Sequence, residues 1–219
     1  MKIHSKLSAG LCLVFVFALA VASVAQTAAA PAPTTPTTLS AEERDSALKS
    51  LQATHDAFLQ SIAGLSEKQW RFKPAPDRWS VAEVSEHIAV SESMIFGMVQ
   101  SKVMTSPADP SKRAEVAGKD EIILTKVPDR SHKAQAPEFL KPTNRWATRE
   151  ETIKAFEDSR KVTMDYVRTT TDDLRDHFGP HPLLGPMDAY QWILLISAHS
   201  ERHTKQIEEV KADPNFPKE

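Results

Sequence analysis

Two histidines four residues apart, His199 and His203, lie in the segment AHSERHTKQIEEV (residues 198–210). Residues i and i+4 of an α-helix lie about 40° apart around its axis, so a helix here places both imidazoles on one face. The residues that share this face are Trp192, Ile196, Gln206 and Val210, and the charged residues Glu201, Lys205 and Glu208 lie opposite. Both histidine rings are therefore predicted to point into the protein.

A third histidine, His87, lies in SVAEVSEHIAVSE (residues 80–92) and shares a predicted inward helix face with Val84, Ser91, Met94 and Met98. If the two helices are neighbours, His87, His199 and His203 can meet at one point. Three imidazoles can hold a divalent ion and leave positions open, which is the pattern of a reactive rather than a closed structural site. Imidazole binds several such ions, so the sequence does not choose among Zn, Ni, Mn and Fe.

A different interpretation of the same residues is that they bind nothing and are hydrogen-bonded core histidines, because His pairs at this spacing also arise by chance. His55 lies on the apolar face of the first helix and could be a fourth ligand, a pocket-lining base or a core residue. Arg160 lies within an apolar stripe, where a buried guanidinium needs an anion. That anion could be an acidic substrate or a structural Asp or Glu, and the alternative is that the guanidinium extends to the surface. His55 and Arg160 are the candidates for catalytic residues.

Four amphipathic helices are predicted to position these side chains, and no segment shows the alternating pattern of a strand. Three of the helices start with a capping box, in which Ser or Thr is followed three residues later by Glu: these pairs are Ser40 and Glu43, Ser80 and Glu83, and Thr148 and Glu151. The fourth helix is expected to begin after Gly185-Pro186, because Pro is well suited to a first turn.

Two connections between these helices, residues 64–79 and 105–147, are too long for simple helix hairpins, and the second is expected to hold a short helix near residues 120–125. Long connections in bundles usually mean crossovers. The sequence therefore predicts an all-α fold, a four-helix bundle with long crossover connections. The aromatic residues Trp70, Phe72 and Trp79 are expected to close one end of the bundle.

The N-terminal segment has the pattern of an export signal. Lys2 and Lys6 precede an uncharged apolar run from Leu11 to Val24, and small residues allow cleavage after Ala25. An uncleaved anchor is the alternative, but the run is shorter than the ~20 apolar residues of a membrane span. The predicted order is a signal peptide (residues 1–25), an Ala/Pro/Thr-rich linker (26–39) and a folded domain (40–213), in a periplasmic or secreted protein without a membrane anchor.

Charge and cysteine content exclude several classes of function. Removing residues 1–25 removes two lysines and no acidic residue, which moves the net charge from -2 to -4. An acidic chain does not favour nucleic-acid binding. The one cysteine, Cys12, lies in the predicted signal. Disulfides, thiolate ligands and a cysteine nucleophile are therefore excluded from the predicted mature chain, and metal ligands must be His, Asp or Glu.

Two stretches resemble the DinB-like superfamily: LSEKQWRFKPAPDRWSVAEVSEHIAVSE and HPLLGPMDAYQWILLISAHSERHTKQIEEV. The resemblance covers about residues 41–212. It implies a four-helix bundle with a divalent metal held by three histidines, which here are His87, His199 and His203. Some members are transferases or isomerases that use low-molecular-weight thiols. These thiols are cytoplasmic, so that role fits an exported chain poorly.

The resulting functional hypothesis is an exported metal-dependent enzyme, a hydrolase or transferase that acts on a small organic substrate. An ion at the three histidines would lower the pKa of a bound water or thiol and polarise a substrate oxygen. The alternative is a non-catalytic bundle that binds a metal or small ligand, or a dimeric stress-associated protein. Relatives often pair through helices, so a homodimer is expected.

Overall fold

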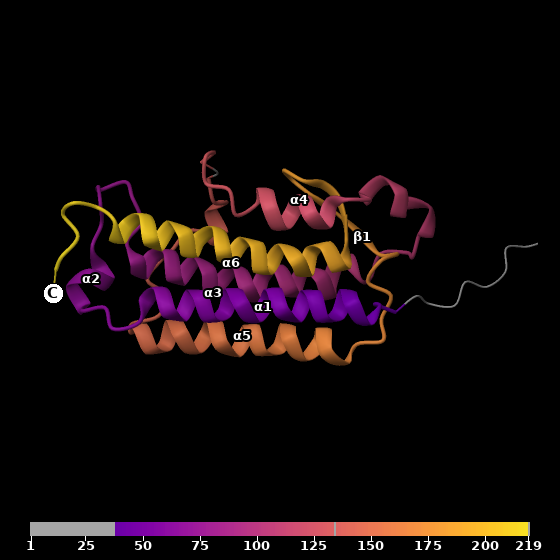
Figure 1. The fold of residues 1–219 in the computed structure, drawn as a ribbon, viewed down its shortest axis with the longest axis horizontal. Coiled ribbons are helices and arrows are strands. Elements are labelled where there is room, and N and C mark those ends of the chain that lie inside the picture. Colours follow the sequence, from indigo (N-terminus) through magenta and orange to yellow (C-terminus); the bar gives the residue numbers. More distant parts are fainter. Residues whose placement is uncertain (1–37, 134, 219) are drawn as a thin grey trace, which may run out of the picture. The chain divides into compact units, whose positions relative to one another are not determined.

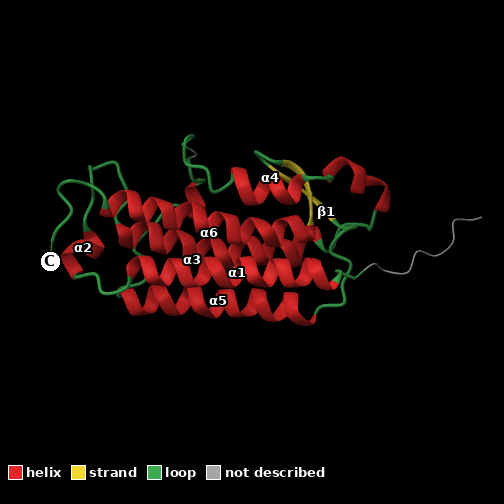
Figure 2. Cartoon of the chain, in the orientation of Figure 1, coloured by secondary structure: helices red, strands yellow, loops and turns green. Residues whose placement is uncertain are grey.

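The structure, a computed structural model, describes residues 38–133 and 135–218. Four long helices form the body of this region: α1 (Ala41–Ile62), α3 (Val81–Met98), α5 (Arg149–Thr169) and α6 (Ala189–Lys211) (Figure 1). The shorter helices are α2 (Glu67–Arg71), α4 (Lys119–Lys126), the π-helix η1 (Val99–Val103) and the 3-10 helices η2 (Pro110–Val116) and η3 (Glu138–Leu140). The strands are β1 (Phe178–His181) and β2 (Gly185–Asp188) (Figure 2). The predicted four-helix bundle is confirmed. The predicted signal peptide lies outside the described residues.

The three predicted capping boxes open α1, α3 and α5. In each, the Ser or Thr hydroxyl accepts the backbone N–H of the Glu three residues on, and the Glu carboxylate accepts the N–H of the capping residue. The short helix expected near residues 120–125 is α4. Each of these three helices therefore begins where side chains accept hydrogen bonds from the otherwise unpaired N–H groups at its start.

The predicted start of α6 is wrong. Gly185 and Pro186 belong to β2, which pairs with β1 in an antiparallel hairpin that no pattern in the sequence had predicted. The helix begins at Ala189, after Asp188, whose carboxylate accepts the N–H of Gln191 in a further capping box. Strand pairing keeps the chain extended as far as Asp188, and the helix starts only where this carboxylate can cap it.

The helices run in two directions. The C-terminal ends of α1 and α6, with Ile62 and Val210, join the N-terminal parts of α3 and α5, with Val81 and Phe156, in one apolar cluster around Trp70. Helix α1 packs against α5 and α6, and α3 packs against the same two helices. Neighbouring helices α3 and α5 therefore run in the same direction.

This arrangement explains the long connection between α3 and α5. The chain leaves α3 at one end of the bundle and must return to the other end before α5 begins. Residues 99–148 make this return, and α4 packs against α6 on the way (Figure 1). We call residues 127–146 of this connection the crossover segment. The predicted crossover wiring is confirmed.

The core is apolar along the length of the bundle. Leu51, Phe58, Ile88, Phe156 and Ile193 are fully buried. Leu39, which the sequence analysis assigned to the linker, is 6% exposed and joins the core, so the folded part begins at least one residue earlier than expected. None of the helices in residues 38–133 and 135–218 combines the length and apolar character needed to cross a membrane.

Candidate metal centre

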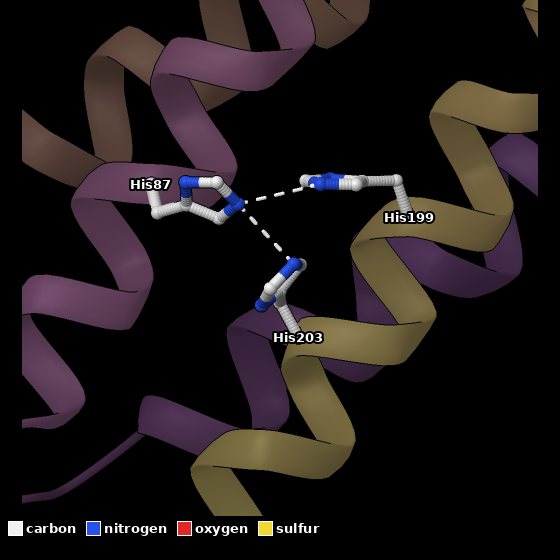
Figure 3. Close-up of side chains that lie close together, drawn as sticks. All are labelled: His87, His199 and His203. Carbon is white, nitrogen blue, oxygen red and sulfur yellow. Dashed lines mark hydrogen bonds between the residues drawn. The ribbon is translucent and has the colours of Figure 1, made fainter. Parts of the chain in front are cut away.

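The three histidines that the sequence analysis singled out lie together between α3 and α6 (Figure 3). His87 comes from α3, and His199 and His203 come from successive turns of α6. Nε2 of His87 lies 3.3 Å from Nε2 of His199 and 3.2 Å from Nε2 of His203. Each of the three residues offers one ring nitrogen, and all three nitrogens lie within 4.8 Å of one another. One nitrogen from each ring thus faces a common point.

The second ring nitrogen of two of these histidines faces an oxygen. Nδ1 of His87 lies 2.8 Å from the carbonyl oxygen of Leu140 in the crossover segment. Nδ1 of His203 lies 2.8 Å from Oε1 of Gln206, one turn further along α6. A carbonyl oxygen only accepts hydrogen bonds, so each Nδ1 must carry the proton. In a neutral ring the Nε2 atom then presents a lone pair toward the common point.

Two lone pairs 3.2 Å apart repel each other unless a cation lies between them. Protonation is disfavoured, because burial lowers the pKa of His87, lowers that of His199 to about 3, and lowers that of His203 well below its usual value. A metal ion needs unprotonated imidazoles. Nitrogens bound tetrahedrally to Zn²⁺ at ~2.05 Å lie about 3.3 Å apart, which matches the separations of His87 Nε2 from Nε2 of His199 and of His203. The donor set therefore fits a divalent metal ion.

The three histidines differ in exposure. His87 is 2% exposed, whereas His199 and His203 are partly exposed. Trp79 packs against the His87 ring, with the ring centroids 5.0 Å apart, and limits its movement. Among the residues that the structure describes, no Asp, Glu or further His joins the group. Three histidines with no further protein donor beside them fit a reactive site better than a closed structural one, which has four protein ligands.

Residues adjacent to the ligands attach the crossover segment to both helices. Glu86, next to His87, accepts the backbone N–H groups of Thr143 at 2.7 Å and Arg145 at 3.2 Å. Arg202, next to His203, donates to three main-chain carbonyls, those of Val127, Asp129 and His132. The crossover segment is thus fastened to α3 and α6 on either side of the three histidines.

The candidate catalytic residues His55 and Arg160 do not join this group. His55 lies on α1, stacks on Phe156 at 5.6 Å, and its Nδ1 lies 2.8 Å from the Asp56 carboxylate. Arg160 is 1% exposed and pairs with Glu92.

All five N–H donors of Arg160 have acceptors: the Glu92 carboxylate, the Leu51 carbonyl oxygen, and the hydroxyls of Thr54 and Ser200. The sequence allowed either a substrate or a structural carboxylate as the partner of Arg160. In the structure the partner is a structural carboxylate, that of Glu92.

The sequence analysis missed the partners of the ligands. The Leu140 carbonyl oxygen belongs to the main chain and has no signature in the sequence. Gln206 had one, because it lies on the same predicted helix face as His203, three residues away. Arg130, which donates to Gln206, lies 76 residues from it in the chain, and only the folded crossover segment brings the two together.

Known proteins resemble this chain in sequence and in fold. A sequence model of the DinB superfamily matches residues 19–207. Among curated proteins, the uncharacterized protein YuaE of Bacillus subtilis (strain 168) is 24% identical over 150 residues, which cover 68% of this chain and 88% of YuaE.

Two solved structures share the fold. YfiT from Bacillus subtilis, described as a probable metal-dependent hydrolase with an unusual four-helix bundle topology, has a TM-score of 0.53 at 17% identity, with 82% of this chain and 91% of YfiT covered. TT2238, a four-helix bundle protein, has a TM-score of 0.50 at 17% identity, with 76% and 98% covered.

Proposed function

Because the chain belongs to the DinB superfamily, and because three of its histidines face one point, we propose that it is a metal-dependent hydrolase of a small organic substrate. The observation that carries this proposal is the convergence of three ring nitrogens, with Nε2 of His87 3.3 Å from that of His199 and 3.2 Å from that of His203. The description of YfiT as a probable metal-dependent hydrolase supports the same reaction class.

His87, His199 and His203 would hold the ion, which is divalent and of the Zn, Ni, Mn or Fe type. When bound, such an ion supplies a Lewis acid that polarises an oxygen atom of a reactant. The chain itself orients the three rings: the Leu140 carbonyl oxygen and Gln206 hold the Nδ1 protons of His87 and His203. A substrate would approach from the side of His199 and His203, which are partly exposed. Hydrolysis is favoured over thiol transfer because the known thiol cofactors are cytoplasmic and the chain is predicted to be exported.

We also propose that the chain is exported and that its signal is removed after Ala25. The charge pattern of residues 1–25, two lysines before an apolar run, supports this. The N-terminal sequence of the protein recovered from a bacterial host tests it. A mature chain that begins at Gln26 is expected, and a chain that retains residues 1–25 in the cytoplasm contradicts the proposal.

Metal content is the first test of the hydrolase proposal. The protein is purified without an affinity tag and its metals are measured by mass spectrometry. About one equivalent of a transition metal is expected in the wild type and little in His203→Gln. His132→Gln is the matched control, because it also removes one histidine, but one whose side chain is exposed in the crossover segment.

Turnover is the second test. The metal-free protein is loaded with Zn²⁺, Ni²⁺ or Mn²⁺ and screened with ester, amide and thiol-transfer substrates. Metal-dependent cleavage of an ester or amide that His203→Gln lacks supports the proposal. Metal uptake without turnover on any class contradicts the enzyme and favours a non-catalytic metal-binding bundle. Turnover on thiol-transfer substrates alone contradicts hydrolysis.

A further inference from the structure

We infer that Arg130 is a positioning residue for the three-histidine centre: it orients the side-chain amide of Gln206, and that orientation decides which ring nitrogen of His203 carries the proton. The inference concerns the protein without metal. It rests on the proposed function only for its consequence, which is that Arg130 keeps Nε2 of His203 free to bind an ion.

The contacts form a chain from the crossover segment to the ligand. The guanidinium of Arg130 binds both carboxylate oxygens of Glu209, with Nε 2.5 Å from Oε1 and Nη2 2.7 Å from Oε2. Its Nη1 lies 3.4 Å from Oε1 of Gln206. The same Oε1 lies 2.8 Å from Nδ1 of His203. One amide oxygen thus faces two donors, the Arg130 guanidinium and the His203 ring.

An amide side chain has two orientations, and they have opposite consequences for His203. With the oxygen toward the ring, Nδ1 must carry the proton and Nε2 has the lone pair. With the amide turned by 180°, its NH₂ group would face the ring, Nδ1 would have to accept, and the proton would move to Nε2. The proton would then occupy the position from which a metal ion is bound.

Arg130 decides between these two orientations. A guanidinium has only N–H donors, so the turned amide would place its NH₂ against another donor. Arg130 therefore favours the orientation in which the amide oxygen faces the His203 ring. His87 needs no residue to orient its acceptor. The Leu140 main-chain carbonyl that faces its Nδ1 cannot turn to present a donor.

The fold holds Arg130 in place. Its side chain is 17% exposed, and its two bonds to Glu209 lie side by side, a geometry that restricts a guanidinium strongly. The backbone around it is held by Arg202, which donates to the carbonyls of Val127 and Asp129 on one side and of His132 on the other. Arg202 directly precedes His203 in the chain, so the ligand and the residue that orients it share one anchor.

The experiment measures the tautomer of His203 in the metal-free protein at neutral pH, from the ¹⁵N chemical shifts of its two ring nitrogens. Arg130→Met removes the donor and keeps an unbranched side chain. Gln206→Glu replaces the amide with a carboxylate, which accepts whichever way it turns, so it makes Arg130 unnecessary. The control is Arg168→Met, which removes an exposed arginine that pairs with Asp165 on α5. Circular dichroism checks that each variant is folded.

In the wild type and in Arg168→Met, His203 is expected to carry its proton on Nδ1. In Arg130→Met a substantial fraction should carry it on Nε2, and Zn²⁺ should bind about tenfold more weakly, at the lower end of the loss usual for an outer partner of a ligand. The double variant Arg130→Met/Gln206→Glu should return the proton to Nδ1.

The inference is overturned if His203 in Arg130→Met keeps the wild-type tautomer, or if the wild type already carries the proton on Nε2. Failure of the proposed function gives a different result: the tautomers follow Arg130 as described, but the wild type binds no metal ion. The tautomer is read without metal, so it tests the role of Arg130 in either case.

Discussion

Nε2 of His87 and Nε2 of His203 lie 3.2 Å apart, and the opposite nitrogen of each ring faces an oxygen that only accepts hydrogen bonds. His87 and His203 lie on different helices and are 116 residues apart in the sequence. When each neutral ring carries its proton on Nδ1, the two Nε2 lone pairs face and repel each other. Binding of a divalent ion relieves this repulsion, and metal binding should therefore be linked to the stability of the fold.

The first prediction is that Zn²⁺ stabilises the folded protein through these histidines. At a free concentration 100 times its dissociation constant, the ion should raise the free energy of unfolding by about 2.7 kcal/mol. Urea denaturation with and without Zn²⁺ measures this. His203→Gln should lose most of the increase, and the exposed His132→Gln should keep it. Equal stabilisation of both variants would place the ion elsewhere.

The second prediction concerns pH. Burial lowers the pKa of His199 from 6.5 to about 3 in the folded protein. Between these values the unfolded chain binds the proton more tightly, so this contribution to stability is complete above pH 6.5 and is lost as the pH falls toward 3. In the metal-free protein, His199→Gln should reduce the slope of unfolding free energy against pH by up to about 1.4 kcal/mol per unit. Equal slopes between pH 4 and 6 would contradict it.

The third prediction concerns the buried pair of Glu92 and Arg160, whose side chains are 0% and 1% exposed. Arg160→Met leaves a carboxylate unpaired in the core and should cost about 3–5 kcal/mol. Glu92→Leu leaves a guanidinium unpaired and should cost a similar amount. The double variant should cost clearly less than the sum of the two, as measured by urea denaturation. Additive losses would show that the two charges do not stabilise each other.

The fourth prediction concerns the attachment of the crossover segment. Glu86→Ala removes the acceptor of the Thr143 and Arg145 N–H groups. Their amide hydrogen exchange should accelerate roughly 30-fold, which corresponds to about 2 kcal/mol for hydrogen bonds to a charged group.

The Ser131 N–H, which Asp129 accepts in the same crossover segment, is the internal control for the Glu86→Ala measurement. It should exchange at its original rate. An equal acceleration at Ser131 would mean that the whole segment detaches, and that Glu86 is not a local anchor.

The helices of this fold could be predicted because their starts depend on residues three positions apart. Ser80 and Glu83, for example, satisfy each other's backbone N–H groups whatever the rest of the chain does. The same device, with Gln in place of Glu, opens α2 at Ser66 and α6 at Asp188. Both were missed, since α2 has only five residues and Gly185-Pro186 offered a competing start.

The hairpin before α6 could not be predicted from local patterns. Its strands have four residues each, too few for an alternating pattern, and Pro180 pairs with Pro186. Neither proline has an N–H, so neither donates a backbone hydrogen bond to its partner. Contacts with the rest of the domain hold the hairpin, as when the backbone N–H of Phe178 donates to the Ser106 hydroxyl.

The three histidines could be predicted to face inward, because each lies on the apolar arc of its own helix. That they meet could only be a hypothesis, because it depends on α3 and α6 being neighbours, which follows from the wiring of the whole bundle. The hydrogen-bond partners of the histidine rings were even harder to predict from the sequence. Gln206 shares a helix with His203, but Leu140 and Arg130 reach the site through a connection with no regular pattern.

Trp79 lies with its indole centroid 5.0 Å from that of the His87 ring, and this contact gives the protein a built-in optical reporter. Paramagnetic ions quench the fluorescence of a nearby indole, so Cu²⁺ or Ni²⁺ at the three histidines should dim the emission of Trp79. Comparison with Trp79→Phe separates this signal from those of Trp70, Trp146 and Trp192. The filling of the centre can thus be followed by titration in a cuvette, with no added dye.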